Sequence, residues 1–118
     1  PETVATAIRI GNPVNAKKAM AAVKSSKGMF LAVSDEEILI AQKDLASSEG
    51  IFAEPASCAT LAGLYKLRKQ GDLPKKVRVV MVLTGNGLKD PEIVGKMILS
   101  PNEVAAEYET LREAILSC

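Results

Sequence analysis

The sequence predicts a single α/β domain that covers residues 1–118. Helical and strand-like patterns alternate along the chain, and short connections join them, which is typical of α/β proteins. The run VRVVMVL at 77–83 is almost continuously apolar, as expected for a strand that is covered on both faces in a parallel sheet. A chain of 118 residues is also long enough to bury a core.

The first predicted elements are a strand and a helix. Residues 4–10 (VATAIRI) indicate a strand or an extended segment, which the following GNP ends. Asn12 is expected to cap the helix, with Pro13 at its first helical position. Lys27 and Gly28 are expected to close this helix. Its apolar face follows helical spacing and consists of Ala16, Met20 and Val23.

A short strand and a second helix follow. Residues 29–33 (MFLAV) predict the strand. Ser34 and Glu37 have the spacing of a capping box, which marks the start of the helix, and Gly50 marks its end. The stripe expected to be buried consists of Ile38, Ala41 and Leu45.

A third helix is predicted to begin at Pro55. Its first two turns consist almost entirely of small residues, so something must approach it closely: more often another helix or a sheet, less often a ligand. A loop (DLPKK) then leads to the predicted strand at 77–83.

The C-terminal stretch predicts a final amphipathic helix of about four turns. Ser100 and Glu103 repeat the capping-box spacing, Pro101 takes the first helical position, and Leu99 is placed to pack on the first turn. The expected apolar stripe consists of Val104, Tyr108, Leu111 and Ile115.

Composition excludes several classes of function. The net charge is +1 and aromatic residues make up 3%, so neither a basic stripe nor base stacking favours a nucleic-acid partner. No apolar run approaches the ~20 residues that cross a membrane, and we expect neither a membrane span nor a signal peptide. The only cysteines are Cys58 and Cys118, which favours a reduced, cytoplasmic setting. Because histidine is absent, no metal-ligand spacing exists, and acid–base chemistry must use Lys, Glu, Asp, a cofactor or groups outside this chain.

Thr84 is the first candidate site residue. It directly follows the predicted strand and precedes glycines at 85 and 87. Ligands bind at such strand ends in α/β proteins, although a simple turn would use the same residues. The pattern is neither a dinucleotide fingerprint nor a P-loop, since the required glycine spacing is absent.

Three further residues have a structural interpretation beside a functional one. Glu54 precedes the predicted third helix, where the helix dipole favours a carboxylate without any function. Cys58 could be an activated nucleophile at the same helix start, but no basic partner is identifiable and a packing role is favoured. Arg9 could bind an anion, or it could face outward from a strand.

Three segments, read together and in order, carry a resemblance. They are PETVATAIRIGNPVN (1–15), VSDEEILIAQKDLASSEGIFAEPAS (33–57) and VVMVLTGNGLKDP (79–91). They resemble the C-terminal part of the threonine synthases, pyridoxal-phosphate enzymes of fold type II. The resemblance implies a partial three-layer αβα sheet domain, the C-terminal portion of the large domain of such an enzyme.

The resemblance also implies a cofactor site. The Thr84 hydroxyl would bond the pyridine nitrogen of pyridoxal 5'-phosphate, with Gly85 beside it, and Glu54 would lie near the ring. Ala5 and Thr6, with Ala7, would lie beside the cofactor face. The substrate implied is O-phospho-L-homoserine, which reacts with water to give L-threonine and phosphate.

Essential parts of such a site are not found in these residues. The Schiff-base lysine, the asparagine loop for the substrate carboxylate and the glycine-rich phosphate loop have no counterpart in the sequence. We therefore expect a fragment that is inactive alone, that needs a missing N-terminal part of the same chain, and that belongs to a homodimer. Two alternatives stay open: a fragment of another fold type II enzyme such as a serine/threonine dehydratase, or a non-catalytic α/β binding or dimerisation module.

Overall fold

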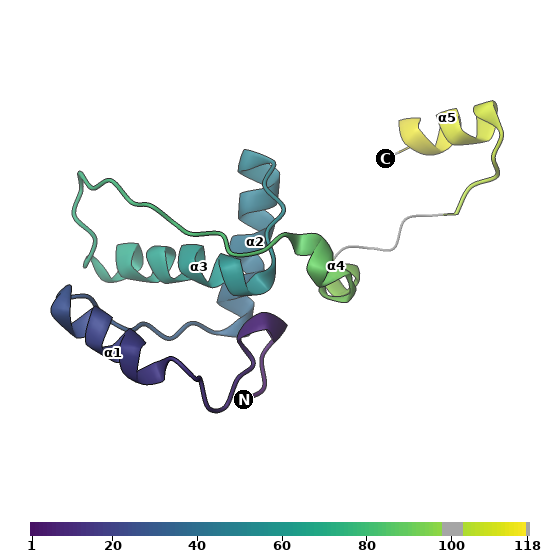
Figure 1. Cartoon of the computed structure of the whole chain (residues 1–118). Coiled ribbons are helices and arrows are strands. Elements are labelled where there is room, and N and C mark those ends of the chain that lie inside the picture. Colours follow the sequence, from purple (N-terminus) through teal and green to yellow (C-terminus); the bar gives the residue numbers. More distant parts are fainter. Residues whose placement is uncertain (98–102, 118) are drawn as a thin grey trace.

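The computed structural model describes residues 1–97 and 103–117 (Figure 1). Within those ranges the regular secondary structure is helical, apart from one isolated β-bridge. Its longer helices α2 and α3 pack against each other and form the centre of the molecule. The elements in chain order are η1 (Thr6–Ile8), α1 (Ala16–Ser25), α2 (Asp35–Glu49), α3 (Pro55–Gln70), η2 (Gly87–Lys89), α4 (Pro91–Met97) and α5 (Tyr108–Leu116). No helix among the described residues is long and apolar enough to cross a membrane.

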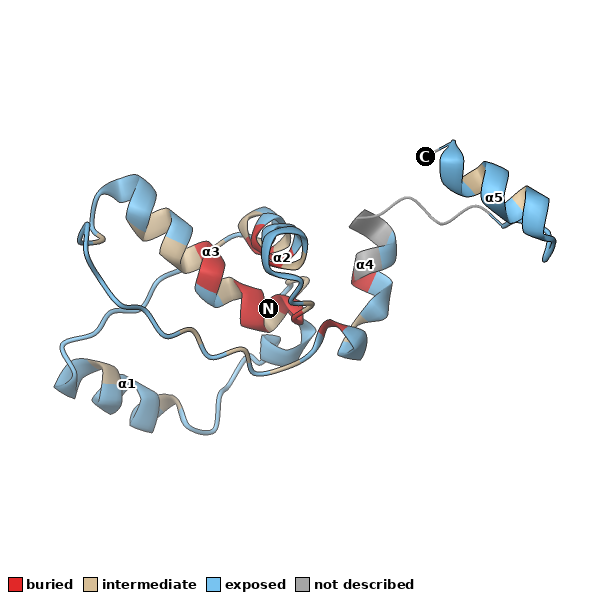
Figure 2. Ribbon diagram, turned by 90° about the horizontal axis from the view of Figure 1, so that it is seen from above, coloured by how far each residue is buried: buried red, intermediate tan, exposed pale blue. Residues whose placement is uncertain are grey.

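The hydrophobic core lies between α2 and α3 and includes the N-terminal turn (Figure 2). The stripe predicted for the second helix is confirmed, because its members are at most 5% exposed. Small residues on α3 allow the close approach of the two helices. The buried cluster consists of Ala5, Ile38, Ala41, Leu45, Ala53, Cys58, Leu61 and Ala62.

The predicted end of α2 and the predicted start of α3 are confirmed. Gly50 ends α2 and Gly71 ends α3, with φ values of 67° and 82°, which L side chains rarely adopt. Pro55 occupies the first turn of α3, where its missing N–H leaves no intrahelical bond unmade.

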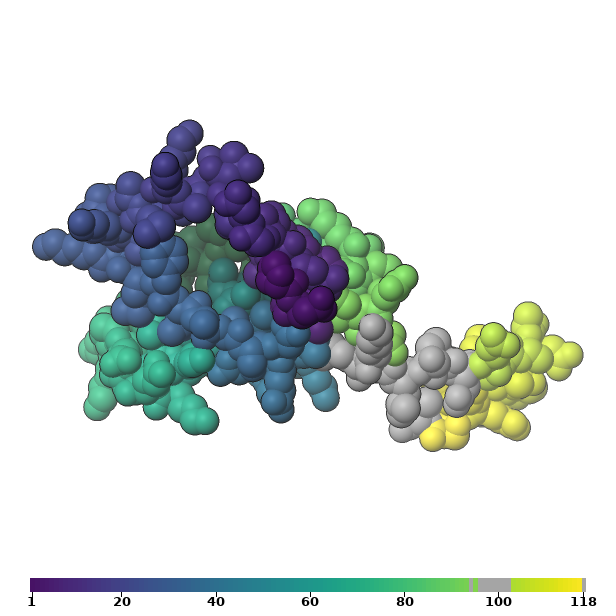
Figure 3. Space-filling view, turned by 90° about the horizontal axis from the view of Figure 1, so that it is seen from below, coloured from purple at the N-terminus to yellow at the C-terminus, as the bar shows by residue number. Residues whose placement is uncertain are grey.

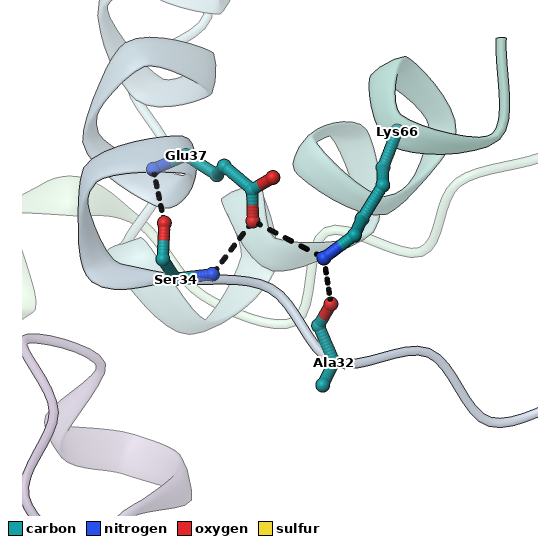
Figure 4. A network of polar contacts seen from close by, with 4 residues as sticks. All are labelled: Ala32, Ser34, Glu37 and Lys66. Carbon is teal, nitrogen blue, oxygen red and sulfur yellow. Dashed lines mark hydrogen bonds and ion pairs between the residues drawn. The ribbon is translucent and has the colours of Figure 1, made fainter. Parts of the chain in front are cut away.

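A capping box fixes the start of α2 (Figure 4). The N–H of Glu37 donates to Ser34 Oγ at 3.2 Å, and the N–H of Ser34 donates to Glu37 Oε2 at 2.7 Å. This second bond is the main cause that lowers the pKa of Glu37, with Lys66 adding to it. Lys66 Nζ lies 3.8 Å from the same carboxylate and donates to Ala32 O at 2.8 Å, so the box also connects α3 to the segment before α2.

We predict that Ser34→Ala lowers the free energy of unfolding of the chain by about 1 kcal/mol, because the Glu37 N–H loses its acceptor. Denaturant titration followed by circular dichroism measures the change. Ser47→Ala is the matched control: its hydroxyl donates only to Asp44 O of its own helix at 3.3 Å, and no loss is expected. Equal losses in both variants would contradict a specific role for the box.

The three predicted strands are not formed in the described chain. Residues 4–10 contain η1 instead, while 29–33 and 77–83 have no regular structure. A strand needs a neighbour for its backbone N–H and C=O groups, and the described residues supply only one isolated bridge, between Ala53 and Asn86. The run at 77–83 is consequently exposed, with Val80 at 84% and Val82 at 67%.

The first predicted helix is present as α1, but its start and its apolar face differ from the prediction. The helix begins at Ala16 with Asn15 as N-cap, because the chain first makes a turn in which the Ala16 N–H donates to Pro13 O at 3.1 Å. Asn12 is therefore not the cap. No residue of α1 is buried, and Met20 is 62% exposed. Lys27 and Gly28 close the helix as predicted: Lys27 has a φ of 54°, and the Gly28 N–H donates to Val23 O at 2.9 Å.

The C-terminal region also departs from the prediction. Residues 103–107 are not helical and α5 begins at Tyr108, while Leu99, Ser100 and Pro101 lie outside the described residues. Short helices are marginal unless an apolar face is packed, and no residue of α5 is buried. Its stripe is exposed, at 75% for Tyr108 and 65% for Ile115. Helix α4 was not predicted, although Pro91 and Glu92 are suitable residues for a first turn.

Candidate functional site

The site forms where residues 84–87 lie against the N-terminus of α3. The Glu54 N–H donates to Gly85 O at 3.0 Å, and the Gly87 N–H donates to Phe52 O at 3.0 Å. These bonds flank the antiparallel bridge between Ala53 and Asn86. Two segments that are about thirty residues apart in sequence are thereby held in register, as expected for paired backbones.

Gly85 is required by the closeness of this approach. A Cβ atom built at Gly85 would lie 2.2 Å from Cδ of Glu54 and 2.3 and 2.4 Å from its carboxylate oxygens. Gly87 is similarly close to a side chain, since its Cβ would lie 2.4 Å from Cζ of Phe52. Both glycines of the TGNG motif therefore allow backbone to pass directly over a side chain.

Three side chains converge beside Gly85. Thr84 Oγ1 donates to Glu54 Oε1 at 3.3 Å and lies 3.1 Å from Ser57 Oγ. The Gly85 N–H donates to Ser57 Oγ at 3.0 Å. Glu54 is 6% exposed and Ser57 is 1% exposed, whereas Thr84 is an exposed residue at the edge of the cluster. The hydroxyl of an exposed residue thus contacts a buried carboxylate and a buried hydroxyl.

Three of the residues predicted for the site, Glu54, Thr84 and Gly85, come together. Ser57 belongs to the same cluster and was not predicted as a site residue. Its sequence signal was ambiguous, because a serine in the first turn of a small-residue helix is equally suited to packing. Only its position three residues after Glu54, on the face turned toward Gly85, distinguishes it.

The predicted N-terminal residues lie nearby in a different arrangement. Ala5 is fully buried and belongs to the core. Thr6 is exposed and its hydroxyl donates to Asp90 Oδ2, which joins η1 to the residue after η2. Figure 3 shows the first residues of the chain next to the segment around residue 90. Ala7 is exposed. Their predicted place beside a cofactor face stays a prediction.

Cys58 and Arg9 have structural roles. Burial raises the pKa of the Cys58 thiol to about 11, and the nearby Glu54 adds to this shift. The thiol is therefore protonated near neutral pH, which disfavours a nucleophile. Arg9 donates to the backbone oxygen of Thr3, from Nε at 3.2 Å and from Nη2 at 2.5 Å, and lies outside the cluster.

Comparison with known proteins assigns the class. Residues 1–85 match the family model described as pyridoxal-phosphate dependent enzyme. The chain belongs to this family, whose members fit the α/β fold class that the sequence predicts. It is 55% identical over 115 residues to a threonine synthase of Methanosarcina acetivorans and 50% identical over 115 residues to that of Methanocaldococcus jannaschii. Each match covers 98% of this chain.

A threonine synthase of Synechocystis sp. is 59% identical over 92 residues, which are 78% of this chain. The chain spans 28% of the length of the first two relatives and 24% of the third. The similarity thus covers nearly all of these residues and a minor share of each relative.

The residues present are chemically suited to the family's cofactor. Thr84 is an exposed residue, and the contact of its Oγ1 with Glu54 at 3.3 Å is long for an O–H···O bond, so its proton is free to turn toward another acceptor. An unprotonated pyridine nitrogen is an acceptor of that kind. Glu54 and Ser57 hold the hydroxyl in place from the protein side.

Proposed function

We propose that these residues are the C-terminal part of the catalytic domain of a threonine synthase. The intact enzyme would convert O-phospho-L-homoserine and water to L-threonine and phosphate, using pyridoxal 5'-phosphate. The observation that carries the proposal is that the hydroxyl of the exposed residue Thr84 contacts the buried side chains of Glu54 and Ser57. The similarity to threonine synthases over 98% of the chain supports the choice of reaction.

Thr84 would hold the ring nitrogen of the cofactor, with Gly85 allowing the close approach and Glu54 fixing the position of the hydroxyl. The cofactor, when bound, supplies an electron sink for carbanion chemistry. A neutral hydroxyl donor leaves the ring nitrogen unprotonated, whereas an aspartate would favour a pyridinium. The sink is therefore milder, which suits β/γ chemistry in which electrons must be returned to expel a leaving group.

Other parts of the site would come from the rest of a longer polypeptide. Neither the lysine motif nor the phosphate-binding loop of the family occurs in these residues, so we expect the 118-residue chain alone to be inactive. In the intact enzyme, 77–83 would pair with neighbouring strands and complete a three-layer αβα sheet in a single domain, which would cover its exposed valines. We further propose a homodimer in the cytoplasm.

Thr84→Val in the intact protein tests this role. We expect the affinity for pyridoxal phosphate to fall about tenfold, the effect of losing one hydrogen bond at the upper end of the usual range. Thr84→Ser keeps the hydroxyl and should bind within about threefold of the wild type. Fluorescence titration of the purified apoprotein measures both affinities. Equal affinity of wild type and Thr84→Val would contradict the assignment of Thr84.

The products separate the proposed reaction from its alternatives. A threonine synthase releases phosphate from O-phospho-L-homoserine and no ammonia from serine or threonine. Release of ammonia from serine or threonine would instead identify a dehydratase. Failure of the intact protein to bind pyridoxal phosphate at all would favour a non-catalytic module.

A further inference from the structure

We propose that Ser57 is a positioning residue that orients the Thr84 hydroxyl toward the ring nitrogen of the cofactor. The proposal rests on the proposed function and adds a residue to its site. Ser57 contacts both halves of the loop that would meet the cofactor: its Oγ accepts from the Gly85 N–H at 3.0 Å and lies 3.1 Å from Thr84 Oγ1.

The donors and acceptors of this cluster define one direction of hydrogen bonding. A serine hydroxyl has a single proton, and the Gly85 N–H already donates to Ser57 Oγ. That proton can go to Thr84 Oγ1 at 3.1 Å or to Gly85 O at 3.4 Å. The contact with Thr84 is the shorter of the two and lies closer to the usual O–H···O distance, so it is favoured.

A bond donated by Ser57 to Thr84 determines what the threonine proton can do. Thr84 then accepts from Ser57 and must use its own proton as a donor, either to Glu54 Oε1 or to an acceptor outside the protein. The bonds run in one direction, from the Gly85 N–H through Ser57 and Thr84 to Glu54 Oε1, and the last of them would turn to the ring nitrogen when the cofactor is bound. Hydrogen bonds in such a chain polarise one another and strengthen the last donor.

Ser57 is also held more rigidly than Thr84. It lies in the first turn of α3, its N–H donates to Glu54 O at 3.0 Å, and it is 1% exposed. Thr84 is exposed and lies outside any helix. Without Ser57, the Thr84 hydroxyl would keep its contact with Glu54 Oε1 at 3.3 Å but would lose the donor that orients its oxygen.

A double-mutant cycle in the intact protein tests whether Ser57 acts through Thr84. The variants are Ser57→Ala, Thr84→Val and the double variant, each titrated with pyridoxal phosphate. We expect Ser57→Ala to weaken binding about three- to tenfold. In the Thr84→Val background, Ser57→Ala should cause no further loss. If the loss of affinity in the double variant equalled the product of the two single losses, Ser57 would act independently of Thr84 and the proposal would be overturned. Unchanged affinity in Ser57→Ala would also overturn it.

A spectroscopic readout separates positioning from general support of the fold. With cofactor labelled with ¹⁵N in the ring, the nitrogen resonance reports the hydrogen bond that it accepts. Ser57→Ala should shift this resonance toward its position in Thr84→Val. Thr60→Val is the matched control on the same helix, because its hydroxyl donates to the backbone oxygen of Ser57 at 2.7 Å and has no bond to the side chains of Glu54, Ser57 or Thr84. A resonance that moves equally in Thr60→Val would overturn the proposal.

If Ser57→Ala does not fold, Ser57→Cys takes its place in the double-mutant cycle, because cysteine has a side chain of similar shape and a weaker donor. Its loss of affinity should be smaller than that of Ser57→Ala and should also vanish in the Thr84→Val background. A wild-type protein that binds no pyridoxal phosphate would refute the proposed function itself. Normal binding with an additive cycle would refute only the role of Ser57.

Discussion

Gly85→Ala in the intact enzyme is expected to weaken pyridoxal phosphate binding by about 5- to 150-fold, the equivalent of about 1–3 kcal/mol of overpacking. The added Cβ would lie 2.2–2.4 Å from the Glu54 carboxylate group, a distance that real Cβ atoms do not show. The carboxylate is the end of a side chain and would move before the backbone does. Its movement breaks the contact with Thr84 Oγ1 and removes the support of that hydroxyl. Fluorescence titration of the apoprotein measures the loss.

Gly95→Ala is the matched control for this substitution. A Cβ at Gly95 has no heavy atom within 4 Å, and the residue lies in helix α4, where alanine is the better helix former. The control should bind the cofactor as the wild type does and should be at least as stable. If Gly85→Ala also binds like the wild type, then the approach of residue 85 to Glu54 has no part in holding the cofactor.

The helices of the centre could be predicted because their signals are local. Ser34 with Glu37 at one end of α2, and Gly50 at the other, are determined by neighbours within a few residues. The start of α1 was misplaced because Pro13 and Asn15 are both acceptable residues near a helix start, and the preceding turn decided between them. Local sequence signals thus predict that a helix is present more reliably than they predict its first residue.

The predicted strands are not formed among the described residues, because a strand depends on pairing with residues far away in sequence. The run at 77–83 has strong strand propensity, yet it has no pairing partner among the described residues. The same dependence explains the apolar faces of α1 and α5, which follow helical spacing but remain exposed. In each case the sequence pattern indicates a surface to be covered, and these residues do not cover it.

The candidate site was predicted in part, for a related reason. Thr84 and Glu54 were candidates from their places in the sequence, and the resemblance to a family gave them roles at a cofactor. The contact between their oxygens at 3.3 Å was not predicted. Ser57 was overlooked because its function depends on Gly85, which is 28 positions away in sequence. The glycine at 85 was expected beside the cofactor or in a simple turn, but its close packing over a carboxylate depends on the tertiary structure.

The second large effect is expected at Ile38, in the core of the 118-residue chain. Ile38→Ala should lower the free energy of unfolding by about 2–5 kcal/mol, since the side chain is 3% exposed and its removal leaves a cavity between packed helices. Ile38→Val, which removes one methylene, should cost about 0.5–1.5 kcal/mol. Denaturant titration by circular dichroism measures both.

Ile40 is the matched control for Ile38, because it is the same residue type on the same helix but is 52% exposed. Ile40→Ala should change the free energy of unfolding by less than about 0.5 kcal/mol. If Ile40→Ala and Ile38→Ala lowered the free energy of unfolding equally, then the buried face of α2 would not be the one that carries Ile38. The difference between the two substitutions therefore measures whether the packing of α2 on α3, which carries Glu54 and Ser57 at its start, exists in the chain by itself.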